Sequence, residues 1–417
     1  MSGKTELLLF DQLSPQVVVE NGFFVDVPPS HSIAENATTI TFSIHGSEMD
    51  YLDLNDTLFY VQVKIFTSSG ATLAADSPIR PVNFTLNALF SDVTLHLNDV
   101  MVEGGTHLYP YKATIENLFG FTHTTKKLQL APAGYNKDND IRLSWIKQSK
   151  SKLFVGALRL DFLNQPKYLL PGVNVRITLT KSKPKFALCG GGTTNPRLII
   201  QDTKLYVRRV RVHDSVLKAH LTSLSHRNAI YPYTRGQVIS YSIPVGSLSH
   251  FRDNLFNSSL LPKLVIVGFV RSSAFNGDNL NEEPFTFEPC NVSFLALYRD
   301  GMSLPYRDSY SPDFTNGMFE VDYFKSIIHN VQHLNTNLNN GISVDDFTKN
   351  CALFTFNLTP DFDMTQCQMS QDGNLRLEMK FSTPLTYAIN VIVYGTFDTQ
   401  IEITKDRQVI CSQHVHH

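Results

Sequence analysis

Apolar and polar residues alternate over short stretches along the whole chain. Four of the clearest are residues 40–44, 59–65, 173–180 and 375–381, in which aliphatic or aromatic residues alternate with polar ones. A period of two places successive side chains on opposite faces, so each stretch predicts an antiparallel strand with one buried face. Gly, Pro, Asn and Asp separate these stretches, as turns require. The pattern indicates all-β sandwiches and argues against βαβ units.

Three segments have apolar residues at helical spacing instead. They are residues 111–119, 217–224 and 324–334, in which apolar positions recur every three or four residues. Asp214 or Ser215 stands where the second of these helices would take its N-cap. We expect all three helices to lie in long connections between strands.

The two halves of the chain resemble each other faintly. A strand, a tight turn and a second strand are predicted at residues 93–102 and again at residues 292–304. An apolar strand precedes each of these units, at residues 58–66 and at residues 264–270, with nearly the same separation between the copies. The repetition indicates a duplicated β domain.

A Gly- and Pro-rich segment at residues 181–196 is the expected linker between the copies. Three consecutive glycines with prolines on both sides suit neither a helix nor a strand. We therefore expect a first domain at residues 1–190, with an N-terminal arm, and a second domain at residues 191–417, with a C-terminal tail.

The composition adds constraints on function. Lys and Arg number 36 against 38 Asp and Glu, and hydrophobic residues make up 42%, which excludes a basic nucleic-acid coat and a mainly disordered chain. Charged residues make up only 18%, below the usual fraction of roughly 25%, which favours a surface partly covered by other subunits.

The sequence has no leader-like start and no apolar stretch of membrane-spanning length, so we expect synthesis in the cytosol. The odd number of cysteines, without CxxC spacing, predicts reduced thiols. These cysteines are Cys189, Cys290, Cys351, Cys367 and Cys411.

Acidic residues offer few candidates for chemistry, and no known catalytic or cofactor motif is found in the sequence. Asp361 with Asp363, and Asp138 with Asp140, could pair as catalytic carboxylates. The loop at residues 276–283 offers oxygen ligands for Ca²⁺, but its spacing matches no EF-hand. Turns and an exposed loop are the favoured interpretation.

Histidines gather at one predicted helix and at the end of the chain. His213, His220 and His226 fall on or beside the helix expected at residues 217–224, without the spacing of a zinc helix. His414, His416 and His417 belong to the expected tail. The sequence thus predicts no catalytic residue, no metal site and no cofactor.

Basic residues cluster at residues 126–127, 147–152, 181–185 and 208–211. The favoured interpretation is solvated loops and strand faces. The alternative is weak, salt-sensitive contact with the phosphates of an enclosed nucleic acid, which needs no base-reading motif.

Five segments in order resemble one protein family. They are residues 82–99 (VNFTLNALFSDVTLHLND), 107–120 (HLYPYKATIENLFG), 229–246 (AIYPYTRGQVISYSIPVG), 260–278 (LLPKLVIVGFVRSSAFNGD) and 285–305 (FTFEPCNVSFLALYRDGMSLP). Together the chain resembles the hexon-like major capsid proteins of Polinton/Maverick elements and adintoviruses, from about residue 40 to residue 409.

The resemblance implies an all-β fold of two tandem jelly-roll sandwiches, a double jelly roll with short helices in the connections. It implies a homotrimer that forms a pseudo-hexameric capsomer of an icosahedral shell around double-stranded DNA, without enzymatic activity or small-molecule substrate. The expected partners are copies of the chain, neighbouring capsomers, penton and minor capsid proteins, and packaged DNA through weak nonspecific contacts. The expected location is the virion, after synthesis in the host cytosol and assembly in the nucleus or cytoplasm.

The main alternative function is a receptor- or glycan-binding β-sandwich, such as a minor capsid or spike-like protein, because jelly rolls also serve as lectins. Glycan sites often pair an exposed Trp with Asp or Asn. The single Trp145 has basic neighbours and no acidic residue closer than Asp140. A glycoside-processing enzyme is disfavoured further, since the required carboxylate constellation is missing.

Overall fold

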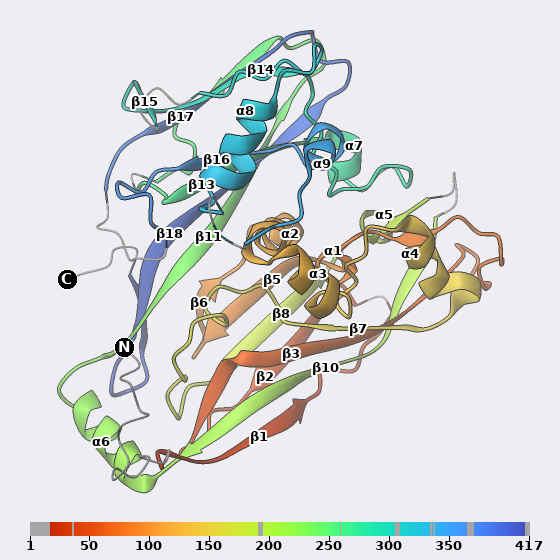
Figure 1. Ribbon diagram of the computed structural model, residues 1–417. Helices are drawn as coiled ribbons and strands as arrows, with labels where there is room; N and C mark the ends of the chain where they lie inside the picture. Colours follow the sequence, from red (N-terminus) through yellow and green to blue (C-terminus); the bar gives the residue numbers. More distant parts are fainter. Residues whose placement is uncertain are drawn as a thin grey trace, which may run out of the picture.

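The computed structural model describes residues 17–35, 37–190, 195–258, 260–304, 309–333, 336, 338–364 and 371–412. Within these residues the chain forms two β-sandwiches, each made of two facing antiparallel sheets. In Figure 1 the first sandwich lies below the second.

The first sandwich consists of two four-stranded sheets. One sheet has, in spatial order, β1 (Val19–Val27), β10 (Arg197–Val212), β3 (Asp50–Phe66) and β7 (Lys152–Gly156). The other has β2 (Thr39–Ile44), β8 (Val175–Lys181), β5 (Phe90–Leu97) and β6 (Val100–Glu103). A two-stranded ladder of β4 (Arg80–Pro81) and β9 (Leu188–Cys189) lies outside both sheets.

The second sandwich repeats this arrangement. One sheet has β11 (Ala229–Ile243), β18 (Ile389–Ile403), β13 (Leu264–Arg271) and β16 (Leu353–Asn357), and β19 (Val409–Ser412) pairs with β18. The other has β12 (Ser249–Arg252), β17 (Leu375–Phe381), β14 (Val292–Arg299) and β15 (Met302–Leu304).

Both sandwiches have the same strand order. When β4, β9 and β19 are set aside, the first, eighth, third and sixth strands of each unit form one sheet, and the second, seventh, fourth and fifth form the other. The repeated segments found in the sequence occupy equivalent places, since β3 corresponds to β13, and β5 with β6 corresponds to β14 with β15. The two predicted jelly-roll sandwiches are therefore confirmed, and so is the duplication.

Alternating burial explains why these residues form strands. In β8, Val175, Ile177 and Leu179 are buried, whereas Arg176 points to solvent. The four alternating stretches of the sequence fall on β2, β3, β8 and β17. Burying one apolar face of each sheet against its partner supplies the main stabilisation of a sandwich.

Helices occupy the connections between strands, as expected. They are α1 (Thr85–Ala88), α2 (Tyr109–Gly120), α3 (His123–Gln129), α4 (Asn139–Ile146), the 3-10 turn η2 (Lys147–Ser149), α5 (Pro184–Ala187), α6 (Asp214–Leu224), α7 (Ser272–Phe275), α8 (Glu320–Tyr323), the π-helical η3 (Phe324–His329) and α9 (Val344–Lys349). None of the helices formed by the described residues is long and apolar enough to cross a bilayer.

The three predicted helices are present with different ends. Residues 111–119 lie in α2, and α6 covers residues 217–224. His213, not Asp214 or Ser215, caps α6, because its Nδ1 accepts a hydrogen bond from the Ser215 N–H. The third helix is a short α turn followed by a π turn and ends at His329, so its predicted last turn does not form as helix; residue 334 lies outside the described residues.

Strand β10 lies beyond the expected boundary at residue 190 but belongs to the first sandwich. It pairs with β3 from Arg197 to Arg211 and with β1 along most of its second half. The sheets of the first sandwich therefore extend to Val212. The Gly-rich segment leads into the last strand of this sandwich, and glycines 191 and 192 themselves lie outside the described residues.

Candidate functional site

The contact between the two sandwiches is built around helix α2 (Figure 1). Most residues of α2 are buried, including polar ones, and the helix packs against β5 of the first sandwich and β11 and β18 of the second. A helix that is buried all round belongs to an interior. Most of the segment at residues 111–119 is therefore covered by the chain itself.

Aromatic rings pack one side of α2 against the second sandwich. The ring of Tyr111 is stacked on that of Phe275, with centroids 5.4 Å apart, and meets Phe285 and Phe287 edge to face. Phe186 of the first sandwich completes the group. Such ring pairs contribute beyond the area they bury, about 0.5–1.5 kcal/mol each. One contiguous core cluster accordingly includes residues of both sandwiches.

A buried charge cluster fastens the other side of α2. The Nζ of Lys112 lies 2.9 Å from Asp161 Oδ1, 2.9 Å from Glu116 Oε1 and 3.1 Å from Glu103 Oε1. The second sandwich contributes the Gly236 N–H, which donates to Asp161 Oδ2 at 2.8 Å. We name Lys112, Glu103, Glu116 and Asp161 the junction charge cluster.

Burial changes the proton affinity of this cluster. It raises the pKa of Glu103 to about 8 and that of Glu116 to about 7, because a buried carboxylate loses its hydration. Burial also opposes the charge of Lys112, but Asp161, Glu103 and Glu116 outweigh it and hold the pKa of the ammonium well above its ordinary value. One cation thus faces three carboxyl groups, and bound protons reduce the excess negative charge.

Gly236 permits the close approach of β11 to this cluster. A Cβ at that position would lie 2.8 Å from Glu116 Oε1 and equally close to the Tyr394 ring. Tyr394 donates its hydroxyl hydrogen to Glu116 Oε1 at 3.3 Å. Any side chain at residue 236 would therefore force the side chain of Glu116 or Tyr394 to move.

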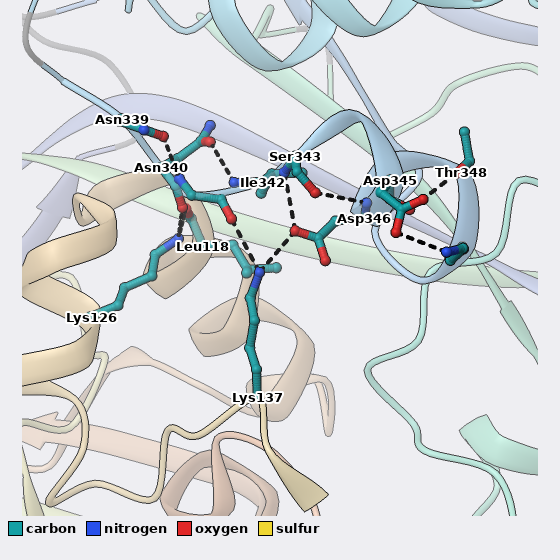
Figure 2. A network of polar contacts seen from close by, with 12 residues as sticks. Leu118, Lys126, Lys137, Asn339, Asn340, Ile342, Ser343, Asp345, Asp346 and Thr348 are labelled. Carbon is teal, nitrogen blue, oxygen red and sulfur yellow. Dashed lines mark hydrogen bonds and ion pairs between the residues drawn. The ribbon is translucent and has the colours of Figure 1, made fainter.

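Lysines of the first sandwich make a second contact with the second sandwich, drawn in Figure 2. The Nζ of Lys126 donates to the carbonyls of Asn340, at 2.6 Å, and Leu118. The Nζ of Lys137 lies 2.8 Å from Asp346 Oδ2. Lys126 is buried, which lowers the pKa of its ammonium to about 8. The prediction of a solvated basic cluster at residues 126–127 is therefore wrong for Lys126.

Arginines of the first sandwich make a third contact with the second, on the loop considered for Ca²⁺. Glu283 Oε1 lies 2.9 Å from Arg142 and 3.4 Å from Arg80. Glu282, next to it, pairs with Arg271. Glu282 and Glu283 thus have arginine partners, and no group of three or more His, Cys, Asp or Glu residues suited to a metal occurs in the described part of the chain.

The other acidic candidates have local structural roles. Asp138 caps α4 by accepting from the N–H groups of Asp140 and Ile141. Asp361 accepts from the Asp363 N–H at 3.1 Å, which closes a turn.

The histidines have separate surroundings. His213 caps α6, His220 Nδ1 lies 2.7 Å from the Tyr51 hydroxyl, and His226 is exposed. His414, His416 and His417 lie outside the described residues.

The remaining basic clusters are partly neutralised. On β10, Arg208 pairs with Asp53 and Asp56, and Arg211 pairs with Asp50. Lys183 lies 4.0 Å from an Asp278 carboxylate oxygen. Among residues 147–152, the side chains of Lys147 and Lys150 are exposed.

Trp145, the residue considered for glycan binding, is half buried and already has partners. Its ring meets Phe154 edge to face, and the Nζ of Lys152 lies 4.9 Å from its centroid. These contacts leave little of the ring free for a sugar face, which weakens the glycan-binding alternative.

The cysteines that the structure describes are free thiols, namely Cys189, Cys290, Cys351 and Cys411. Cys367 lies outside the described residues.

An apolar patch lies at α8 and η3, in the connection between β15 and β16. Met318, Val321 and Phe324 are 62%, 67% and 40% exposed. Val344 on the neighbouring α9 is also exposed. Large exposed apolar groups at adjoining positions mark contact surfaces more often than scattered ones do. We name Met318, Val321, Phe324 and Val344 the α8 patch.

Comparisons with known proteins show which solved structures share this fold. No protein-family model matches the chain. An uncharacterized protein of Caenorhabditis elegans is 25% identical over 378 residues, which cover 86% of this chain and 89% of the relative.

Among solved structures, a chain from the cryo-EM structure of the Sputnik virophage is similar with a TM-score of 0.67 and 12% identity, over 100% of this chain and 93% of that one. The PBCV-1 virus capsid gives a TM-score of 0.61 with 10% identity, over 97% and 99%. The mavirus major capsid protein gives 0.55 with 12% identity, over 97% and 93%. The chain has the double jelly-roll fold of these capsid proteins.

Proposed function

We propose that this chain is a major capsid protein, a structural subunit that forms homotrimeric, pseudo-hexameric capsomers of an icosahedral shell around double-stranded DNA. The observation that carries the proposal is the pair of sandwiches with one strand order, fixed to each other by a buried contact. The likeness to virophage and virus capsid structures over nearly the whole chain supports it.

The geometry of a capsomer explains why such a contact would be needed. Three copies of a two-sandwich chain present six similar units around a threefold axis, which gives a nearly hexagonal outline from cyclic symmetry. That outline requires the two sandwiches of each chain to keep a fixed orientation relative to each other. Helix α2, the Tyr111 ring group and the junction charge cluster supply such a fixation.

We propose that the α8 patch contributes to the contact between subunits. Burying a Phe, Val or Met side chain gains about 1.5–3 kcal/mol, so the patch in three copies would favour association strongly. Ile327 is 1% exposed and serves the core, whereas Phe324 on the same turn faces outward.

The finer assignments rest on the sequence resemblance and on the strand pairing. We propose membership of the Polinton/Maverick and adintovirus lineage, penton and minor capsid proteins as further partners, and assembly in the nucleus or cytoplasm.

We place the division between the two domains within residues 213–228 instead of at residue 190, since β10 closes the first sandwich. Contact with DNA is proposed for exposed lysines such as Lys147 and Lys150 rather than for the paired arginines of β10. We propose no catalytic, metal or cofactor role for any residue.

Mass measurement in solution tests the proposal. A capsomer subunit of 47.0 kDa should give a stable species of three times that mass, with pseudo-hexagonal outlines in electron micrographs. A monodisperse monomer at micromolar concentration would contradict the capsid role and favour a binding protein.

A further inference from the structure

A cavity of about 500 Å³ lies at the junction between the two sandwiches. Its wall combines residues of α2, α3 and α4 from the first sandwich with residues 281–286 and 340–351 of the second. The volume falls in the range of small-molecule sites, roughly 300–1,000 Å³. We name it the junction cavity.

The charged side chains on its wall do not balance. Four are cationic and two are acidic: Arg80, Lys126, Lys137, Arg142, Glu283 and Asp346. Burial raises the pKa of the Cys351 thiol and of the Tyr135 hydroxyl to about 12, so neither supplies a negative charge at neutral pH. The wall therefore has an excess of two positive charges.

The pairing within the wall leaves this excess in place. Both arginines share a single oxygen, Oε1 of Glu283. Lys126 is 1% exposed, and the partners found for its ammonium in the described part of the chain are two carbonyl oxygens. A buried cation normally requires a negative partner, because dipoles alone repay only part of its lost hydration.

The wall also contains buried polar atoms with unused hydrogen-bonding capacity. The Nε of Arg80, the Nε of Arg142 and the Oγ1 of Thr114 have no hydrogen-bond partner among the described residues. Arg142 is 2% exposed and Thr114 is fully buried. Buried donors without partners are rare in folded proteins and call for a specific explanation.

We propose that the junction cavity binds a compact polyanion with at least two negative charges, either a phosphate or a small polycarboxylate, which bridges the two sandwiches. Guanidinium and ammonium groups on several sides would meet its oxygens with charge-assisted hydrogen bonds. No residue of the α8 patch lines the cavity, and the proposal does not depend on the capsid role.

Calorimetric titration of the full chain tests this proposal, with inorganic phosphate in one arm and citrate in the other, at constant ionic strength and pH 7. We expect saturable binding of at least one anion at one site per chain, and the tighter of the two identifies the class of ligand. Arg80→Met and Lys137→Met should each weaken binding about tenfold, the loss typical of one charge-assisted hydrogen bond.

Lys349→Met is the matched control. Lys349 also lies 2.8 Å from an aspartate of α9, Asp345, but does not line the cavity, so binding should stay unchanged. Saturable binding by neither anion would overturn the proposal, as would wild-type affinity in Arg80→Met and Lys137→Met. Should a variant misfold, crystals of the wild-type chain soaked with tungstate test the proposal without any substitution. Electron density for the heavy anion between Lys126 and Arg142 would support the site, and its absence there would contradict it.

Discussion

Replacing Lys112 with Met removes the only cation of the junction charge cluster while keeping the length of the side chain. The Lys112 side chain is 10% exposed, and those of Glu103, Glu116 and Asp161 are 7%, 16% and 8% exposed. Removing one partner of such a buried ion pair costs about 3–5 kcal/mol, because the remaining charges stay buried without compensation. We expect a loss of that size in the free energy of unfolding at pH 8.

The loss should shrink in acid. Glu103 and Glu116 already have pKa values of about 8 and about 7, and without Lys112 both would rise further. At pH 5 these carboxyl groups are protonated in the folded variant and carry no charge that requires a partner. Urea unfolding followed by fluorescence at pH 5 and at pH 8 measures the difference.

A matched control separates burial from charge. Lys349→Met removes a lysine whose side chain is 67% exposed beside Asp345, 75% exposed, and such surface pairs contribute about 0–1 kcal/mol. A cost of Lys112→Met no larger than that of the control at pH 8 would refute the role of the cluster. An equal cost at both pH values would refute the proposed coupling to protons.

Three further outcomes are expected. In the wild-type chain the raised pKa values of Glu103 and Glu116 mean that the folded state binds more protons than the unfolded state, so the free energy of unfolding should fall as pH rises from about 5 through 8; a flat profile in urea titrations would contradict this. Phe324→Asp should leave folding intact and abolish trimers in sedimentation velocity, whereas Ile327→Asp should prevent folding; folded trimers of the Phe324 variant would exclude the α8 patch from the interface. Phe287→Ala, at a fully buried ring, should lower the free energy of unfolding by about 3–5 kcal/mol, and a loss below 1 kcal/mol would show that the aromatic group does not fasten the sandwiches.

The sequence predicted strands and their duplication well because both are local signals. Apolar and polar residues alternate with period two in any strand whose sheet has one face exposed to solvent, as in β8. The helix α6 was predictable for the same reason, since Leu217, Leu221 and Leu224 recur at helical spacing. These patterns need no knowledge of what lies across the fold.

The boundary and the junction were not predictable, because they depend on distant partners. The Gly-rich segment has the composition of a domain linker, but only the pairing of β10 with β3 shows that it precedes a strand of the first sandwich. Lys126 stands in a basic run and nevertheless lies buried against the Asn340 carbonyl, 214 positions away. Likewise the charges around Lys112 are scattered from Glu103 to Asp161 in the sequence.

The pairing of early with late strands has a consequence for synthesis on the ribosome. Strand β1 pairs with β10, and β11 pairs with β18, so the first strand of each sandwich gains its partner only late in the synthesis of that sandwich. These pairings join residues far apart in the chain, which makes folding slow and leaves edges unpaired in nascent chains. The first sandwich can close once Val212 has left the exit tunnel, because none of the described strands of the second sandwich joins its sheets. A nascent chain stopped at residue 190 would lack β10, and both β1 and β3 would present open edges to aggregation.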